Sequence, residues 1–146
     1  MPSVIDVAAY ILAEKGPMTA MKLQKLVYYS QAWSLVWDER PLFNERIEAW
    51  ANGPVSPALY EHHRGQFTVM QLTAGNPGLL DDEARKTVQA VLSYYGDKSA
   101  QWLSDLTHLE APWKDARGTL PDGALSSAEI SQASMAEYYG SLPPGV

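Results

Sequence analysis

The sequence contains no cysteine. Disulfides, thiol catalysis and every zinc or iron–sulfur site that depends on cysteine are therefore excluded. The absence fits a reducing compartment, and we expect the protein to be cytoplasmic. Long apolar runs are absent as well, because no stretch of about 18 apolar residues occurs, so we expect no membrane-spanning helix. The N-terminal segment MPSVIDVAAYILAEKG lacks the basic start of a signal peptide and predicts a helix instead.

The chain also lacks a run of basic residues, and its net charge is −6. Proteins that bind nucleic acid obtain much of their affinity by neutralising phosphates with lysine and arginine. We therefore expect no direct contact with nucleic acid. A basic protein partner suits this charge better.

Catalytic and cofactor motifs are missing too. His62 and His63 are adjacent, so on a helix they point about 100° apart and are poorly placed to share a metal ion. The sequence has no H-E-x-x-H, no G-x-S-x-G and no glycine-rich phosphate loop. We expect no catalytic residue, no metal and no cofactor. One alternative stays open, a hydrolase whose site is formed by Glu61, His62, His63 and His108, and the geometry around those four side chains would decide it.

Aromatic residues are abundant, with five tryptophans and eight tyrosines. Large aromatic side chains form hydrophobic cores, and tyrosine and tryptophan also dominate binding hot spots. Core packing is the expectation for most members of one group: Tyr28, Trp33, Trp37, Trp50 and Trp102. The alternative interpretation of the many aromatic residues is that the protein is an interaction module.

The periodicity of the chain predicts a mainly α fold, a single compact multi-helix domain with a central buried helix and one small β-hairpin. Residues 21–37, MKLQKLVYYSQAWSLVW, are apolar on nearly every side, which is typical of a helix buried on both faces. Two short runs, 41–43 and 47–50, are separated by polar residues and predict the two strands of the hairpin. Ser126 and Glu129 form a capping-box pattern that predicts the start of the last helix.

The stretch AWANGPVSPALY, residues 49–60, predicts a joint between a strand and a helix. Gly53 and Pro54 end the strand. Ser56 is a helix N-cap, and Pro57 suits the first helical position.

Three stretches together resemble one family. They are MKLQKLVYYSQAW, RPLFNERIEAWANGPVSPALYEHHRG and LSDLTHLEAPWKDARG, in this order along the chain. They are similar to the motifs of the Panacea domain, also called the SocA-like antitoxin domain or the phage-associated GepA-type domain. The resemblance runs from about Val4 to Tyr139, so we expect one such domain over 1–140 and a short flexible tail over 141–146.

The resemblance implies a mainly α domain of bacteria and phages that acts as an antitoxin in two-gene toxin–antitoxin systems. It implies a cognate toxin protein, encoded nearby, as the partner. At least one branch of the family instead delivers its toxin to the Clp protease, so an adaptor that also binds a Clp-type unfoldase is the alternative function. We expect no additional domain, and hence no DNA-binding module.

Two groups of residues follow, one from the family pattern and one of candidate contacts, and all members of the second except Glu61 and His63 also match the pattern. We expect most residues of the first group to define the fold: Leu23, Leu26, Gly53, Pro54, Val55, Pro57, His108, Pro112, Trp113 and Arg117. The candidate partner contacts lie near the central helix and the joint: Lys22, Lys25, Tyr28, Trp50, Tyr60, Glu61 and His63. For Trp50 and Tyr28 the competing interpretation is core packing, and for Lys25 it is an ion pair on the helix surface.

Overall fold

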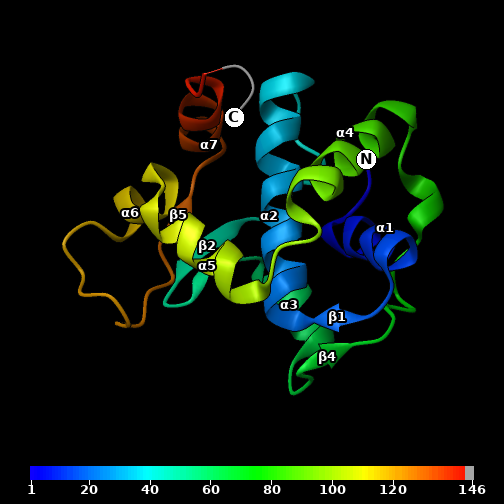
Figure 1. Cartoon of the computed structure of the whole chain (residues 1–146), viewed down its shortest axis with the longest axis horizontal. Coiled ribbons are helices and arrows are strands. Elements are labelled where there is room, and N and C mark those ends of the chain that lie inside the picture. The colour runs from blue at the N-terminus through cyan, green and yellow to red at the C-terminus, as the bar shows by residue number, and fades with distance from the viewer. Residues whose placement is uncertain (144–146) are drawn as a thin grey trace.

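The computed structural model describes residues 1–143 and has a mainly α architecture, which confirms the predicted fold class (Figure 1). The helices are α1 (Val4–Lys15), α2 (Ala20–Trp37), α3 (Pro57–His63), α4 (Asp82–Tyr95), α5 (Ala100–Leu109), α6 (Ala111–Arg117) and α7 (Gln132–Gly140), with one short 3₁₀ helix, η1 (Pro77–Leu79). The strands are β1 (Met18–Thr19), β2 (Ile47–Trp50), β3 (Gly53–Val55), β4 (Thr68–Val69) and β5 (Glu129–Ile130).

Helix α2 runs through the middle of the molecule, with α6 and α7 on one side and α1 and α4 on the other (Figure 1). It begins at the N-cap Thr19, whose hydroxyl accepts a hydrogen bond from the Lys22 amide. Every residue from 23 to 34 is buried. A helix that is apolar nearly all round must be covered on all sides, and here α1, α4, α5 and α7 cover it.

The buried polar residues of α2 hold loops in place. The side-chain oxygen of Gln31 accepts a hydrogen bond from the Leu42 amide at 2.7 Å, and its nitrogen donates to the Phe43 carbonyl at 2.9 Å. Because a buried polar group is costly unless it is hydrogen-bonded, Gln31 fixes the segment that was predicted as a first strand. That prediction is wrong, since residues 41–43 form no strand.

The hairpin lies further along the chain. It joins β2 to β3 in an antiparallel pair, with Ala49 opposite Pro54, and β5 pairs with the other edge of β2 through Ile47 and Ile130. A separate pair joins β1 to β4. Strands of two to four residues are not stable alone, so these ladders depend on the helices that they contact.

The last helix also begins later than predicted. The capping box at Ser126 does not form, because the Ser126 hydroxyl accepts from the Ala128 amide and Glu129 lies in β5. The N-cap of α7 is Ser131, which accepts from the Ser134 amide. Of the predicted tail, residues 144–146 lie outside the described part of the chain.

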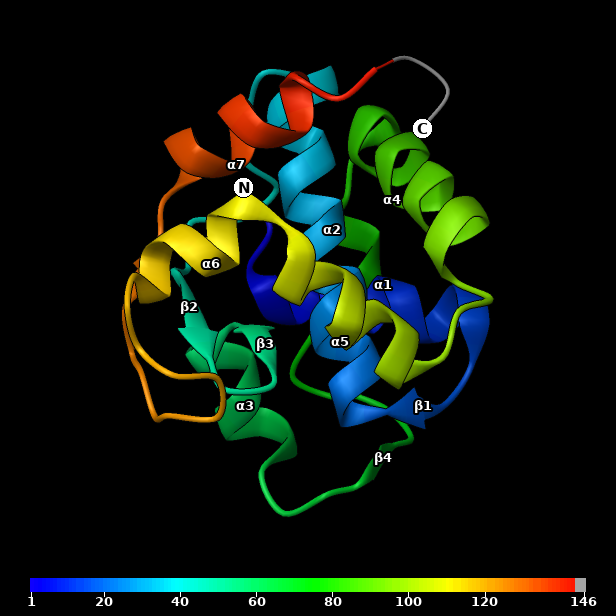
Figure 2. The same cartoon turned by 60° about the vertical axis from the view of Figure 1, so that its left-hand side comes forward.

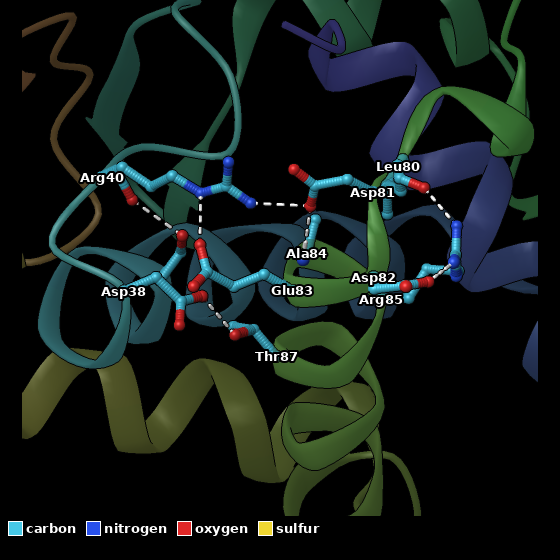
Figure 3. Close-up of polar contacts among 10 residues, drawn as sticks. Asp38, Arg40, Leu80, Asp81, Asp82, Glu83, Ala84, Arg85 and Thr87 are labelled. Carbon is cyan, nitrogen blue, oxygen red and sulfur yellow. Dashed lines mark hydrogen bonds and ion pairs between the residues drawn. The ribbon is translucent and has the colours of Figure 1, made fainter.

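A group of charged side chains fastens the end of α2 to the start of α4 (Figure 3). Arg40 lies between the two helices and pairs with Asp81 at 2.7 Å and Glu83 at 3.0 Å. Asp81 is also the N-cap of α4. The hydrogen bonds from Arg40 and from the helix backbone lower the pKa of Asp81 to about 2. Asp38, just after α2, accepts a hydrogen bond from Thr87 in α4.

Candidate functional site

A pocket of about 180 Å³ opens beside the N-terminal half of α2. Figure 2 shows β3 and α3 lying next to this part of α2. The lining residues come from α2, from the β2–β3 hairpin and from α3: Ala20, Met21, Gln24, Lys25, Trp50, Asn52, Val55, Tyr60 and His63. Most of the exposed wall is apolar, and the polar side chains of α2 lie at its inner end.

The joint predicted from the sequence forms one side of this pocket. Ser56 is the N-cap of α3 and accepts a hydrogen bond from the Leu59 amide, with Pro57 at the first helical position. Gln24 fixes the joint from α2, because its side-chain oxygen accepts from the Ser56 amide at 2.9 Å and its nitrogen donates to the Ser56 carbonyl at 3.2 Å. The joint and α2 are thus held in one geometry.

His63 belongs to the same network. The amide nitrogen of Gln24 lies 2.9 Å from Nε2 of His63. Since that nitrogen donates, Nε2 must accept, which requires a neutral ring with its proton on Nδ1. Burial lowers the pKa of His63 and so favours this neutral form.

Lys25 is the most unusual residue of the site. Its side chain is fully buried, with 1% of the residue exposed, and its ammonium donates to the Pro54 carbonyl at 3.2 Å. Among the described residues no carboxylate lies within ion-pair distance of it. Burial lowers the pKa of Lys25 to about 7. The ion pair on the helix surface considered from the sequence is therefore wrong.

Two aromatic side chains form the wall of the pocket. The rings of Trp50 and Tyr60 meet edge to face, with centroids 5.1 Å apart, and Tyr60 meets His63 in the same way at 5.4 Å. The indole N–H of Trp50 donates to Glu48 at 2.9 Å. Both rings are partly exposed, so they can present an apolar surface to a bound molecule.

The structure brings four of the candidate contacts into this pocket: Lys25, Trp50, Tyr60 and His63. Two others do not line it. Lys22 is half-buried, and Glu61 is exposed and pairs with Arg64 at 3.5 Å. A contact between any of these residues and a partner stays a prediction.

The seventh candidate, Tyr28, lies in a buried network of tyrosines instead. Its hydroxyl is 2.9 Å from that of Tyr139, which donates to Glu110 at 2.8 Å, and Tyr29 donates to the same carboxylate at 2.6 Å. Burial raises the pKa of Glu110. The competing interpretation of core packing is therefore right for Tyr28.

Of the three remaining tryptophans of the aromatic group, two are not in the core. Trp37 is 49% exposed and Trp102 is 41% exposed, whereas Trp33 is buried. Trp37 stacks on Trp33 at the end of α2, and Lys98 lies over the ring of Trp102.

The downstream motif holds the backbone of the upstream one. Four successive carbonyls, two at the end of β2 and two in the turn that follows, each accept a hydrogen bond from a side chain of α5 or α6. Arg117 donates to Ala49 at 3.1 Å, Trp113 to Trp50 at 2.8 Å, His108 to Ala51 at 3.1 Å and Ser104 to Asn52 at 2.6 Å. These four side chains bond to backbone carbonyls, so they fix the shape of the hairpin beside the pocket.

The other members of the structural group are placed as follows. Leu23 and Leu26 are buried in the core, and Pro112 lies in the first turn of α6. Val55 is both the end of β3 and a wall of the pocket.

The residues considered for a hydrolase do not converge. His62 is exposed and lines a different hollow, with Gln66 and Met70. His63 is bonded to Gln24 and His108 to a backbone carbonyl. Within residues 1–143 no group of three or more acidic or histidine side chains could hold a metal ion. Across the same residues, no helix is both long and apolar enough to cross a membrane.

Sequence reasoning did not identify Met21, Gln24 and Asn52 as pocket residues. It also did not identify Phe67, whose ring is 82% exposed while its carbonyl accepts a hydrogen bond from the Ala20 amide at 2.9 Å. Phe67 and Met21 line a second apolar hollow, which shares Ala20 and Met21 with the pocket. A lone phenylalanine in a loop carries no periodic signal, so no sequence pattern singles it out.

Comparison with known proteins identifies the family. The family described as "Antitoxin SocA-like, Panacea domain" matches residues 23–114, which is more than half of the chain. Antitoxin SocA of Caulobacter vibrioides (strain NA1000 / CB15N) is 46% identical over 44 residues, which are 30% of this chain and 23% of that relative. The chain thus matches less than a quarter of that relative's length. No solved structure matches the chain significantly. The matched residues include most of α2, the hairpin and joint, and three of the four side chains that bind the hairpin, Ser104, His108 and Trp113. The chain belongs to the SocA-like antitoxin family with its Panacea domain.

Proposed function

We propose that this chain is the antitoxin of a type II toxin–antitoxin system and neutralises a cognate toxin by direct protein–protein binding. Family membership supports the role, because the family and the curated relative are both described as antitoxins. We further propose that residues 1–140 act as one Panacea domain. The observation that supports the binding mode is the apolar pocket beside α2, which is lined by four of the seven candidate residues.

The toxin-binding surface that we propose extends from this pocket to the neighbouring hollow. We call it the α2 N-terminal surface and define it by Ala20, Met21, Trp50, Tyr60 and Phe67. Exposed apolar groups in a soluble domain mark interaction sites when they are contiguous. Aromatic side chains at the centre of such a surface contribute most of the binding energy.

Replacing Phe67 with serine is expected to weaken toxin binding by at least about tenfold, because it removes an exposed aromatic anchor. Since the ring is 82% exposed, the free energy of unfolding should change by less than about 0.5 kcal/mol. Calorimetric titration of the purified toxin into each variant measures the first effect, and urea unfolding measures the second.

The matched control is Leu125→Ser. Leu125 is 92% exposed and belongs to the loop between α6 and β5. Figure 1 shows this loop on the other side of the hairpin from β4. The control variant should leave the dissociation constant unchanged. An equal loss from both variants, or from neither, would refute the α2 N-terminal surface as the contact.

The role itself is tested with the product of the adjacent gene. We expect that product to be toxic when expressed alone, to be harmless when co-expressed with this chain, and to co-purify with it. A neighbour that is harmless alone contradicts the antitoxin role. If rescue instead shortens the half-life of the toxin in cells, the protein acts as a proteolytic adaptor and not as a direct neutraliser.

A further inference from the structure

Lys25 brings a cation to the inner end of the pocket without a counter-ion. An ammonium group has three N–H donors. One of them is used by the Pro54 carbonyl. Thr107, which faces the same glycine as Lys25, donates its own hydroxyl proton to the Ser104 carbonyl at 2.7 Å. Buried lysines are ordinarily paired with an acidic group, because an isolated buried charge is costly.

The other polar side chains next to Lys25 are already engaged. Gln24 binds both the amide and the carbonyl of Ser56, and it also donates to His63. The pocket therefore combines apolar walls with one cation that has N–H donors left after its bond to the Pro54 carbonyl. The helix dipole of α2 gives a second reason for an anion to bind in the pocket. The first turn of α2 lines the pocket, contains no acidic residue and carries the positive end of the dipole.

We propose that this pocket binds a carboxylate attached to an apolar group, with the carboxylate on the ammonium of Lys25 and the apolar group against Trp50 and Tyr60. The occupant is an acidic side chain of the partner protein that stands next to an apolar residue, and this part rests on the proposed function. The net charge of the chain does not oppose such a contact, since the pocket itself is lined by no acidic side chain.

The contact is strongest when Lys25 is charged. Charge-assisted hydrogen bonds are about twice as strong as neutral ones, and a carboxylate partner offsets the cost of burying the ammonium. The ionisable side chains that line the pocket with Lys25 are His63 and Tyr60, both from α3, while the hairpin contributes Trp50, Asn52 and Val55. Burial keeps the pKa of Lys25 at about 7, so a bound carboxylate must raise it and binding must weaken as the pH rises above 7.

The test uses the purified chain alone, with phenylacetate as the probe and phenylacetamide as its uncharged match. Backbone amide NMR shifts give the dissociation constants. We expect phenylacetate to bind in the millimolar range and to shift the amides around Trp50 and Tyr60. The amide should bind at least about tenfold more weakly, because it lacks the charge. Phenylacetate affinity should fall by about tenfold or more between about pH 6.5 and about pH 8.5, as Lys25 loses its proton.

Two variants make the result decisive. Lys25→Met should remove the preference for phenylacetate over phenylacetamide, and Tyr60→Ala should weaken both probes alike. Equal binding of the two probes to the unmodified chain, or an unchanged preference in Lys25→Met, overturns the proposal. This experiment contains no toxin, so its failure is separate from a failure of the antitoxin role.

A competition experiment tests the occupant. Saturating phenylacetate should weaken the toxin complex, and phenylacetamide at the same concentration should not. A toxin complex that is indifferent to phenylacetate overturns the acidic side chain as the occupant and leaves the pocket as a site for free carboxylates.

Discussion

The free energy of unfolding is expected to rise by about 2 kcal/mol between about pH 7 and pH 9 because of Lys25 alone. Burial lowers the pKa of this ammonium to about 7 in the folded protein, whereas the ordinary value of 10.5 applies when the chain is unfolded. Between these two values the unfolded state holds the proton and the folded state has released it. Stability therefore increases with pH across this window, and the full cost of burying the charge is felt below pH 7.

Urea unfolding at several pH values measures this slope, and Lys25→Met should abolish it. Lys86→Met, at an exposed position in α4, is the matched control and should leave the slope intact. The rise in stability stops below about pH 10, because the buried tyrosines then act in the opposite direction. Burial raises the pKa of Tyr28, Tyr29 and Tyr139, so these phenols ionise first in the unfolded chain and stability falls again. A slope that is equal in Lys25→Met and the unmodified protein would show that Lys25 does not titrate in this range.

The second large effect is expected for Gly53→Ala, which should destabilise the protein by about 3 kcal/mol. Gly53 has φ +121°, a backbone conformation that residues with a side chain adopt only with strain. A Cβ atom there would lie 2.5 Å from Cε of Lys25 and 3.0 Å from the Thr107 hydroxyl. The lysine chain is normally flexible, but here it is buried and its ammonium is bonded to the Pro54 carbonyl, so moving aside would cost that hydrogen bond.

Two further variants separate strain from collision. Gly65→Ala has a comparable backbone conformation, φ +82°, but nothing lies within 4 Å of the added atom, so only the strain should appear. That cost is of the order of 1 kcal/mol. In a Lys25→Ala background, Gly53→Ala should cost distinctly less than in the unmodified protein, because the nearest obstacle is gone. Additive losses in the double variant would place the cost in the backbone and not in the contact with Lys25.

Features that depend on residues three or four positions apart could be predicted from the sequence. The N-terminal segment forms the helix that was predicted there, with Ser3 and Asp6 as its capping box, and Ser56 with Pro57 starts α3 as predicted. Such caps are local hydrogen bonds, so the residues that make them are close in sequence. The apolar character of α2 on every side also predicted a buried helix, and the order of three motifs was enough to indicate the family.

The pairing of the short strands and the roles of the polar residues of α2 could not be predicted in this way, because they depend on contacts between distant parts of the chain. The hairpin runs through β2 and β3 and not through residues 41–43, because Gln31 binds the backbone of the latter segment. Lys25 looks like a surface residue in the sequence, yet the hairpin covers it and α5 and α6 hold that hairpin by its carbonyls. These bonds join positions tens of residues apart. A strand of three or four residues has too weak a β propensity for its pairing to be predicted from the sequence. The pocket and its cation exist only because those distant contacts form.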